Sequence, residues 1–211
     1  PVVPTPRVES VDFAVTSVSL EENGDREPIP YVMPPGLQRQ QTQVATNTSL
    51  RLNEQALALQ VCNLKDADSR AVFKEVSVDM RQFGNLRMFI HAESQVGKAP
   101  ALDGDVRGII RLGSDFTNNY YEYQIPLKIS QPGARDGESI WPEANRLDIT
   151  LDDLVKAKTE RNTKGEPIFV PYRTQDGKGN TIVIVGNPNL GDAKTIMLGV
   201  LNPEKGPQSI N

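Results

Sequence analysis

Residues 120–129 read YYEYQIPLKI and show the clearest pattern in the chain. Every second side chain is apolar, and this first set consists of Tyr121, Tyr123, Ile125, Leu127 and Ile129. The side chains between them are more polar, and this second set includes Tyr120, Glu122, Gln124 and Lys128. Successive side chains of a β-strand point to opposite faces of a sheet. The alternation therefore predicts a strand whose first set is buried and whose second set is more exposed.

Further alternating segments occur on both sides of this stretch, at residues 8–20, 57–62, 72–78, 86–92, 106–112, 182–185 and 195–201. Turn-forming residues separate several of them, as in NLKDADS at 63–69 and DGKGN at 176–180. Eight or nine short strands with turns between them are typical of antiparallel β-sandwiches. We therefore expect an all-β fold, an antiparallel β-sandwich of jelly-roll-like outline.

One segment, residues 151–161, has the pattern of a helix. Thr150 precedes it as a capping residue and Asp153 follows three positions later, a short variant of the capping box. The side chains expected to share one side of this helix are Leu151, Leu154, Val155 and Lys158. Basic residues in its second half suit the negative end of the helix dipole. The sequence thus predicts one short α-helix inside an otherwise β fold.

The stretch from 21 to 50 differs from the rest because prolines at 28, 30, 34 and 35 interrupt any regular pairing. We expect a Pro-rich arm or linker without regular structure. The predicted organisation is therefore an N-terminal strand and arm over residues 1–50, a β-sandwich domain over 51–205, and a tail over 206–211. The length of 211 residues suits one β-domain with such an arm.

Composition excludes several classes of protein. The chain has one Cys, one His and one Trp, which excludes a disulfide scaffold and a zinc cluster of Cys or His ligands. A net charge of −4 argues against binding to nucleic acid, which needs a basic face. No stretch reaches the ~18 apolar residues of a transmembrane helix, so we expect no direct membrane insertion of this segment.

Nucleophilic catalysis would need the single thiol and the single imidazole to meet. Cys62 and His91 both fall within strand-like segments, and no spacing brings them together. A Gly-x-Ser-x-Gly elbow, a phosphate-binding loop and the Pro-Cys-x-x-Cys half of a deaminase signature are all missing from the sequence. We therefore expect no catalytic residues, no cofactor and no enzyme, with Cys62 packed and His91 an ordinary strand side chain.

Metal and sugar binding remain open as alternatives. Asp66 and Asp68 begin like a calcium loop, but Ala71 and Ser77 stand where that loop needs Gly and Glu. The turn with Asp103 and Asp105 has too few ligands by itself, although loops of a sandwich can combine to bind Ca²⁺. Tyr120, alone on the polar face of its strand, is a weak sign of a sugar-stacking platform. The alternative function is a carbohydrate- or calcium-binding β-sandwich module of a secreted surface protein.

An ordered series of motifs resembles one family. The motifs are YVMPPG at 31–36 with QRQ at 38–40, NEQAL at 53–57, VCNL at 61–64, LRMFIHAE at 86–93, IRLGSDFTNNYYEY at 110–123, WPE at 141–143, GNPNL at 186–190 and KTIM at 194–197. They resemble the SprA/Sov family, the giant outer-membrane translocons of the type IX secretion system of Bacteroidetes, also linked to gliding motility. The resemblance covers about residues 28–203, and Met33 and Leu37 are conservative departures from it.

This resemblance implies a structural, non-enzymatic role. The whole protein would be a protein-export channel at the outer membrane or cell surface, and this segment a soluble insert on its periplasmic or extracellular side. Partners would be other translocon components and exported cargo proteins. The family continues into a further strand beyond the last residue here, so we expect a fragment with one open strand edge, beside 194–201, that favours self-association.

Overall fold

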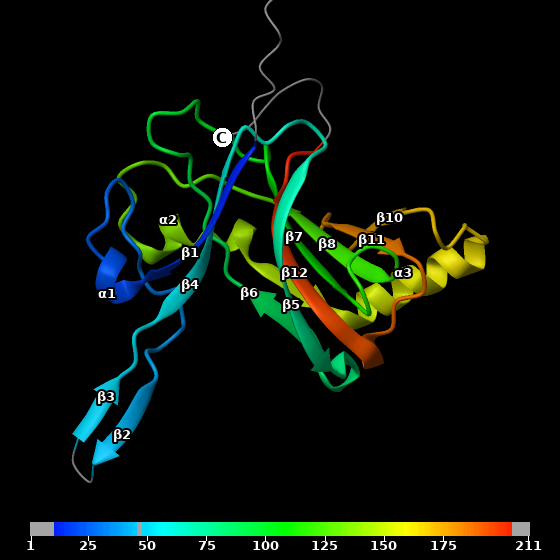
Figure 1. The fold of residues 1–211 in the computed structure, drawn as a ribbon, viewed down its shortest axis with the longest axis horizontal. Coiled ribbons are helices and arrows are strands. Elements are labelled where there is room, and N and C mark those ends of the chain that lie inside the picture. Colours follow the sequence, from blue (N-terminus) through cyan, green and yellow to red (C-terminus); the bar gives the residue numbers. More distant parts are fainter. Residues whose placement is uncertain (1–10, 46–47, 204–211) are drawn as a thin grey trace, which may run out of the picture.

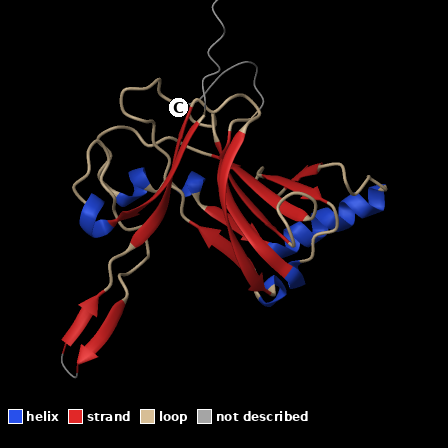
Figure 2. Ribbon diagram, in the orientation of Figure 1, coloured by secondary structure: helices blue, strands red, loops and turns tan. Residues whose placement is uncertain are grey.

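The computed structural model describes residues 11–45 and 48–203. Within these residues the protein is mostly β, with antiparallel sheets and few helices (Figure 2). The predicted β class is therefore confirmed. The largest sheet has six strands in the order β10-β11-β8-β7-β12-β5. Their bounds are β5 (Ser69–Val78), β7 (Arg107–Gly113), β8 (Tyr120–Pro126), β10 (Tyr172–Gln175), β11 (Thr181–Val185) and β12 (Ala193–Leu201).

Three two-stranded sheets complete the β structure. They pair β1 (Asp12–Ser19) with β4 (Gln55–Cys62), β2 (Gln41–Ala45) with β3 (Thr48–Arg51), and β6 (Asn85–Met88) with β9 (Leu147–Thr150). The ribbon of β2 and β3 projects away from the remainder of the chain (Figure 1). The helices are α1 (Leu20–Asn23), α2 (Gly137–Ile140) and α3 (Leu151–Lys164), and the 3₁₀ turns are Met80–Gln82, Glu143–Asn145 and Leu190–Asp192.

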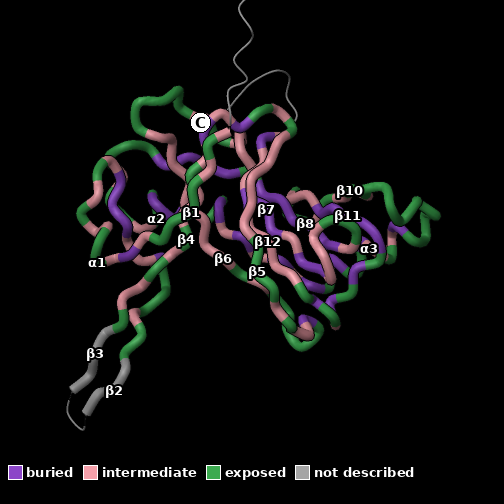
Figure 3. Tube along the Cα trace, in the orientation of Figure 1, coloured by how far each residue is buried: buried purple, intermediate pink, exposed green. Residues whose placement is uncertain are grey.

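The main core lies between one face of the six-stranded sheet and a layer made of α3 with the β6–β9 pair (Figures 1 and 3). Strand β8 contributes Tyr121, Tyr123 and Ile125, which are all buried as the alternation predicted. Across from them lie Leu147 of β9 and Leu154 of α3. Apolar burial of this kind is the main favourable term in folding, so this layer fixes the sheet in place.

The prediction that Tyr120, Glu122 and Gln124 form the more exposed face of this strand is wrong, because all three are buried. Neighbouring strands cover them: Arg111 of β7 pairs with Glu122 and lies 4.3 Å from the centroid of the Tyr120 ring. The Gln124 side chain donates to Glu122 at 2.5 Å. A central strand with long, hydrogen-bonded side chains beside it is thus shielded on both faces. Lys128, beyond the end of β8, is exposed as expected.

Helix α3 forms where the sequence predicts it, with two differences. Thr150 is the N-cap residue, but its side chain makes no capping hydrogen bond, and its hydroxyl accepts instead from Asn85 of β6 at 3.4 Å. Val155 is exposed rather than on the buried side. The face turned to the sheet consists of Leu151, Leu154, Ala157 and Arg161, which follows the spacing of a helix that continues to Lys164.

The segment 21–50, expected to be irregular, contains regular structure. It holds most of α1, all of β2 and the start of β3. The Ser19 hydroxyl caps α1 by accepting from the backbone N–H of Glu22 at 3.2 Å. Ile29 and Tyr31 are buried with Ile140 and Trp141 in a second, smaller core. The proline-containing part of the arm therefore packs onto the domain, whereas β2 and β3 project away from it (Figure 1).

The open edges of the large sheet are not where the sequence placed them. Segment 194–201 does lie in that sheet, but β12 pairs with β7 on one side and β5 on the other. Strand β1 pairs with β4 in a separate sheet. Within the described residues, the outer strands of the six-stranded sheet are therefore β5 and β10.

Because several tyrosines are buried, we expect the free energy of unfolding to fall at high pH. Burial raises the pKa of Tyr121 to about 12. Burial also raises the pKa values of Tyr31 and Tyr123, whose hydroxyls donate to Glu54 and Asp176. In the unfolded chain a tyrosine ionises at pH ~10, so these groups do not reduce stability below that pH. Above it, each buried tyrosine lowers the free energy of unfolding by up to about 1.4 kcal/mol per pH unit. Urea unfolding at pH 8, 9, 10 and 11 measures this slope.

Tyr121→Phe is the control for the alkaline effect, because it keeps the buried ring and removes the ionisable group. We expect a shallower fall in stability above pH ~10 for this variant than for the parent chain. Equal slopes would show that Tyr121 ionises alike in the folded and unfolded chain.

Candidate interaction site

A groove of about 600 Å³ runs between the Pro-rich arm and the β6–β9 pair. It is lined by Tyr31, Pro34, Pro35, Gly36, Leu37, Glu54, Ala56, Arg87, Met88, Phe89, Trp141 and Arg146. Most of its wall is apolar, and the charged groups stand at Glu54, Arg87 and Arg146. The groove combines apolar surface with a few charged groups of both signs, which is the usual composition of a binding site.

Three aromatic rings from distant parts of the chain fix the shape of the groove. The Tyr31 and Trp141 rings meet edge to face with their centroids 5.9 Å apart, and the Phe89 and Trp141 centroids are 6.4 Å apart. The indole N–H of Trp141 donates to the carbonyl of Val32 at 2.8 Å. The Tyr31 hydroxyl donates to Glu54, the residue before β4. The arm is thereby tied to the end of α2 and to the start of β4.

A network of polar side chains next to the groove provides a second attachment of the arm to the domain. The Arg26 guanidinium forms two parallel hydrogen bonds to the Glu93 carboxylate, at 2.7 and 2.8 Å. His91 donates through Nδ1 to the Ile140 carbonyl at 2.8 Å, and its Nε2 lies 3.1 Å from Glu93. Burial would raise the pKa of Glu93, but the hydrogen bonds from His91 and Arg26 outweigh it and hold this pKa below its usual value.

Ser130 completes an arrangement that resembles a Ser-His-Glu triad without its chemistry. Its hydroxyl lies 3.3 Å from Nδ1 of His91, but this nitrogen already donates to a backbone carbonyl. The hydroxyl itself donates to the carbonyl of Ser139 at 3.1 Å, and the side chain is buried. A general base needs a free lone pair toward the nucleophile, and His91 offers none to Ser130 in this geometry.

The other residues that the sequence offered as catalytic or metal-binding candidates also make contacts within the fold. Cys62 is buried and its thiol donates to the Gln95 side chain at 2.7 Å, so Cys62 and His91 have different partners. Asp68 pairs with Arg70 at 2.8 Å. Asp103 accepts from the backbone N–H of Ile129, also at 2.8 Å. Over residues 11–45 and 48–203, no group of three His, Cys, Asp or Glu side chains is placed to hold a metal ion.

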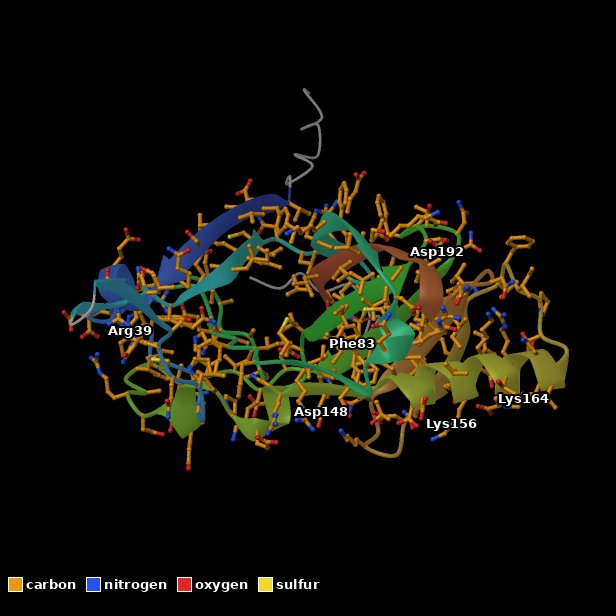
Figure 4. The ribbon with its side chains drawn as sticks, turned by 90° about the horizontal axis from the view of Figure 1, so that it is seen from below. Arg39, Phe83, Asp148, Lys156, Lys164 and Asp192 are labelled. Carbon is orange, nitrogen blue, oxygen red and sulfur yellow. The ribbon has the colours of Figure 1, made fainter. Side chains whose placement is uncertain are left out.

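Charged side chains of both signs lie near the groove on the β6–β9 side. Asp148 of β9 accepts from Arg87 at 3.0 Å and lies 3.6 Å from Lys178. Burial would raise the pKa of Asp148, but Arg87, Lys178 and Arg146 together lower it. Arg146 also pairs with Glu143 at 3.2 Å. Figure 4 places Asp148 on the side of the molecule that also carries Lys156 of α3.

Sequence reasoning missed this groove. Its aromatic rings come from residues 31, 89 and 141, and no local pattern joins positions so far apart. One local signal did exist: His91 and Glu93 are two residues apart in an extended segment, so both point to the same face. The partner Arg26 lies in the arm that was expected to be irregular. Among the described residues, no helix is long and apolar enough to cross a membrane.

The fold and the groove define a β-rich protein of antiparallel sheets with an aromatic-lined surface site. The chain belongs to the SprA N-terminal family, because the family model SprA_N, described as motility related/secretion protein, matches residues 4–211. The match confirms the family that the motifs at 31–197 resemble. It makes the chain part of a motility- or secretion-related protein. No curated protein matches the chain.

Proposed function

We propose that this chain is a non-enzymatic interaction domain of a large protein-export channel of the type IX secretion system. The observation that carries the proposal is the match over residues 4–211 to a family of motility and secretion proteins. The proposed location is the outer membrane or cell surface, with the domain as a soluble insert on the periplasmic or extracellular side. The proposed architecture is a jelly-roll-like sandwich with the arm packed on it.

The geometry supports an interaction role over a catalytic one. The candidate catalytic side chains make hydrogen bonds that stabilise the fold, as seen for Cys62, His91 and Ser130. The groove, in contrast, leaves apolar surface and parts of two guanidinium groups open. Proposed partners are other components of the translocon and its exported cargo proteins. No nucleic acid is expected, because the chain is acidic overall.

The test uses a bacterium that carries the natural full-length protein. Residues 4–211 are deleted in frame, and the secreted proteins in the medium and the spreading of colonies are measured. We expect both to be lost while the shortened protein still reaches the membrane fraction. Normal secretion and spreading with this deletion would contradict the proposal. Saturable binding of a glycan, or a melting temperature raised by Ca²⁺, would favour the alternative of a carbohydrate- or calcium-binding module.

We expect the chain to self-associate through the outer edge of strand β5. It is an outer strand of the six-stranded sheet, and its Phe73 ring is 56% exposed. Such an edge offers backbone groups that a second copy can pair with. We expect light scattering to show a molecular mass that rises with concentration, and Phe73→Lys to suppress this rise.

Phe83→Lys is the matched control for the edge variant. Phe83 is 55% exposed, but it lies beyond the 3₁₀ turn Met80–Gln82 and outside any strand edge. It should leave the association unchanged. A chain that stays monomeric at every concentration, or two variants with equal effects, would show that β5 is not the contact.

A further inference from the structure

We propose that the groove between the Pro-rich arm and the β6–β9 pair binds an extended acidic peptide that carries apolar side chains. The occupant to which we commit is a segment of an exported protein, and this source rests on the function proposed above. The class of ligand follows from three properties of the groove: an apolar wall, an excess of positive charge on one side, and a shape fixed before binding.

The apolar wall selects side chains over sugar or base rings. Pro34, Pro35 and Leu37 line the groove from the arm, and Leu37 is 50% exposed. Proline offers no N–H, so a ligand gains contact there mainly by burying apolar surface. Tyr31 and Trp141 are only 6% and 8% exposed. Their ring faces are covered, so they offer no platform on which a sugar or a nucleobase would stack.

The charges select an acidic ligand. On the β6–β9 side, Arg87 and Arg146 line the groove, whereas their carboxylate partners, Asp148 and Glu143, are not among the lining residues. Arg87 bonds Asp148 through Nε, and Arg146 bonds Glu143 through Nη1. The Glu143 side chain is 82% exposed, so its pair with Arg146 is weak. A ligand carboxylate therefore finds guanidinium N–H groups that can bind it with two parallel bonds.

Glu54, a carboxylate that lines the groove itself, does not cancel this selection. It comes from the segment before β4, not from the β6–β9 side, and it already accepts the Tyr31 hydroxyl. A peptide that places its acidic groups toward Arg87 and Arg146 leaves its apolar groups for the arm. The groove thus favours one orientation of the bound chain.

The walls are fixed in advance, which lowers the entropy cost of binding. The Arg26–Glu93 pair and the hydrogen bond from Trp141 to Val32 both hold the arm against the domain. A ligand that meets a formed groove does not have to order it. Binding is then governed by the contacts of the groove itself.

The single tryptophan of the chain provides the measurement. Trp141 lines the groove, so its fluorescence reports occupancy directly. The probe is a synthetic octapeptide of alternating Phe or Leu with Glu or Asp, blocked at both ends. We expect a saturable change for the 211-residue chain, weakened by added salt. Replacing every acid of the probe by Lys should weaken binding about tenfold or more.

Variants of the chain locate the site. Arg87→Gln and Arg146→Gln should each weaken the acidic peptide about fivefold, because each removes a charge-assisted contact. Lys156→Gln is the matched control, since Lys156 is an exposed cation of α3 that pairs with Asp153 and does not line the groove. It should leave binding unchanged. Near-UV circular dichroism of each variant shows that the fold persists.

Several results would overturn the proposal. They are the lack of a saturable change with the acidic peptide, equal binding of the lysine peptide, equal binding of an oligoglutamate without apolar groups, or unchanged binding by both arginine variants. A double variant, Arg87→Gln/Arg146→Gln, in the full-length protein distinguishes failure of the groove proposal from failure of the export function. Loss of secretion on deletion of 4–211 with normal secretion by Arg87→Gln/Arg146→Gln would retain the export function and reject the groove.

Discussion

Replacing Tyr123 by alanine is expected to lower the free energy of unfolding by about 3–5 kcal/mol. Tyr123 is 2% exposed at the centre of β8, and its ring belongs to the main core. Its hydroxyl donates to Asp176 and accepts from the Asn180 side chain at 2.9 Å, both in the turn between β10 and β11. The substitution therefore leaves a cavity and removes two hydrogen bonds to this turn. Urea unfolding followed by far-UV circular dichroism measures the loss.

Tyr123→Phe divides this loss into its parts. The ring remains and only the hydroxyl is removed, so we expect a cost of about 1–2 kcal/mol from the loss of its hydrogen bonds to Asp176 and Asn180. The cavity then accounts for the difference between the two variants. A total loss below about 1 kcal/mol for Tyr123→Ala would mean that the core closes around the missing ring.

The strand at 120–129 shows what sequence can and cannot predict. Its alternation identified a strand and its core face, because both follow from local geometry. The exposure of the other face depends on what lies across it, and that comes from Arg111 on β7 and Thr181 on β11. Arg107 reaches both Gln124, at 3.3 Å, and Thr181, at 2.9 Å. The residue pattern of one strand does not indicate which strands will lie beside it in the sheet.

The candidate site could be predicted less well than the fold. The prolines of the arm correctly exclude a regular strand at 28–35, but Ile29 and Tyr31 still pack as a core. Tyr31 and Trp141 are 110 positions apart in the sequence and meet only because α2 and the arm lie on the same side of the domain. A single sequence indicates local conformation well, whereas a groove made by three distant segments requires the tertiary structure.

Replacing Gly186 by alanine is expected to cost about 2–5 kcal/mol of stability. Gly186 follows β11 and has φ +68°, the left-handed region that favours glycine. A Cβ there would lie 1.9 Å from the backbone oxygen of Asn118. Its N–H donates to the Ile168 carbonyl at 2.6 Å, and its own carbonyl accepts from buried Arg161 at 2.7 Å. A shift of Gly186 would therefore disturb α3 as well, and thermal unfolding measures the effect.

Gly165→Ala separates the two causes of this effect. Gly165, the C-cap of α3, has nearly the same φ of +71°, but a Cβ there would meet nothing within 4 Å. Its cost should be only the backbone term of about 1–2 kcal/mol. The excess for Gly186→Ala then measures the close approach of Asn118, which is held because Asp115 accepts the backbone N–H groups of residues 117, 118 and 119. Equal costs for the two glycines would show that the 115–119 turn yields, and that this junction is softer than its hydrogen bonds indicate.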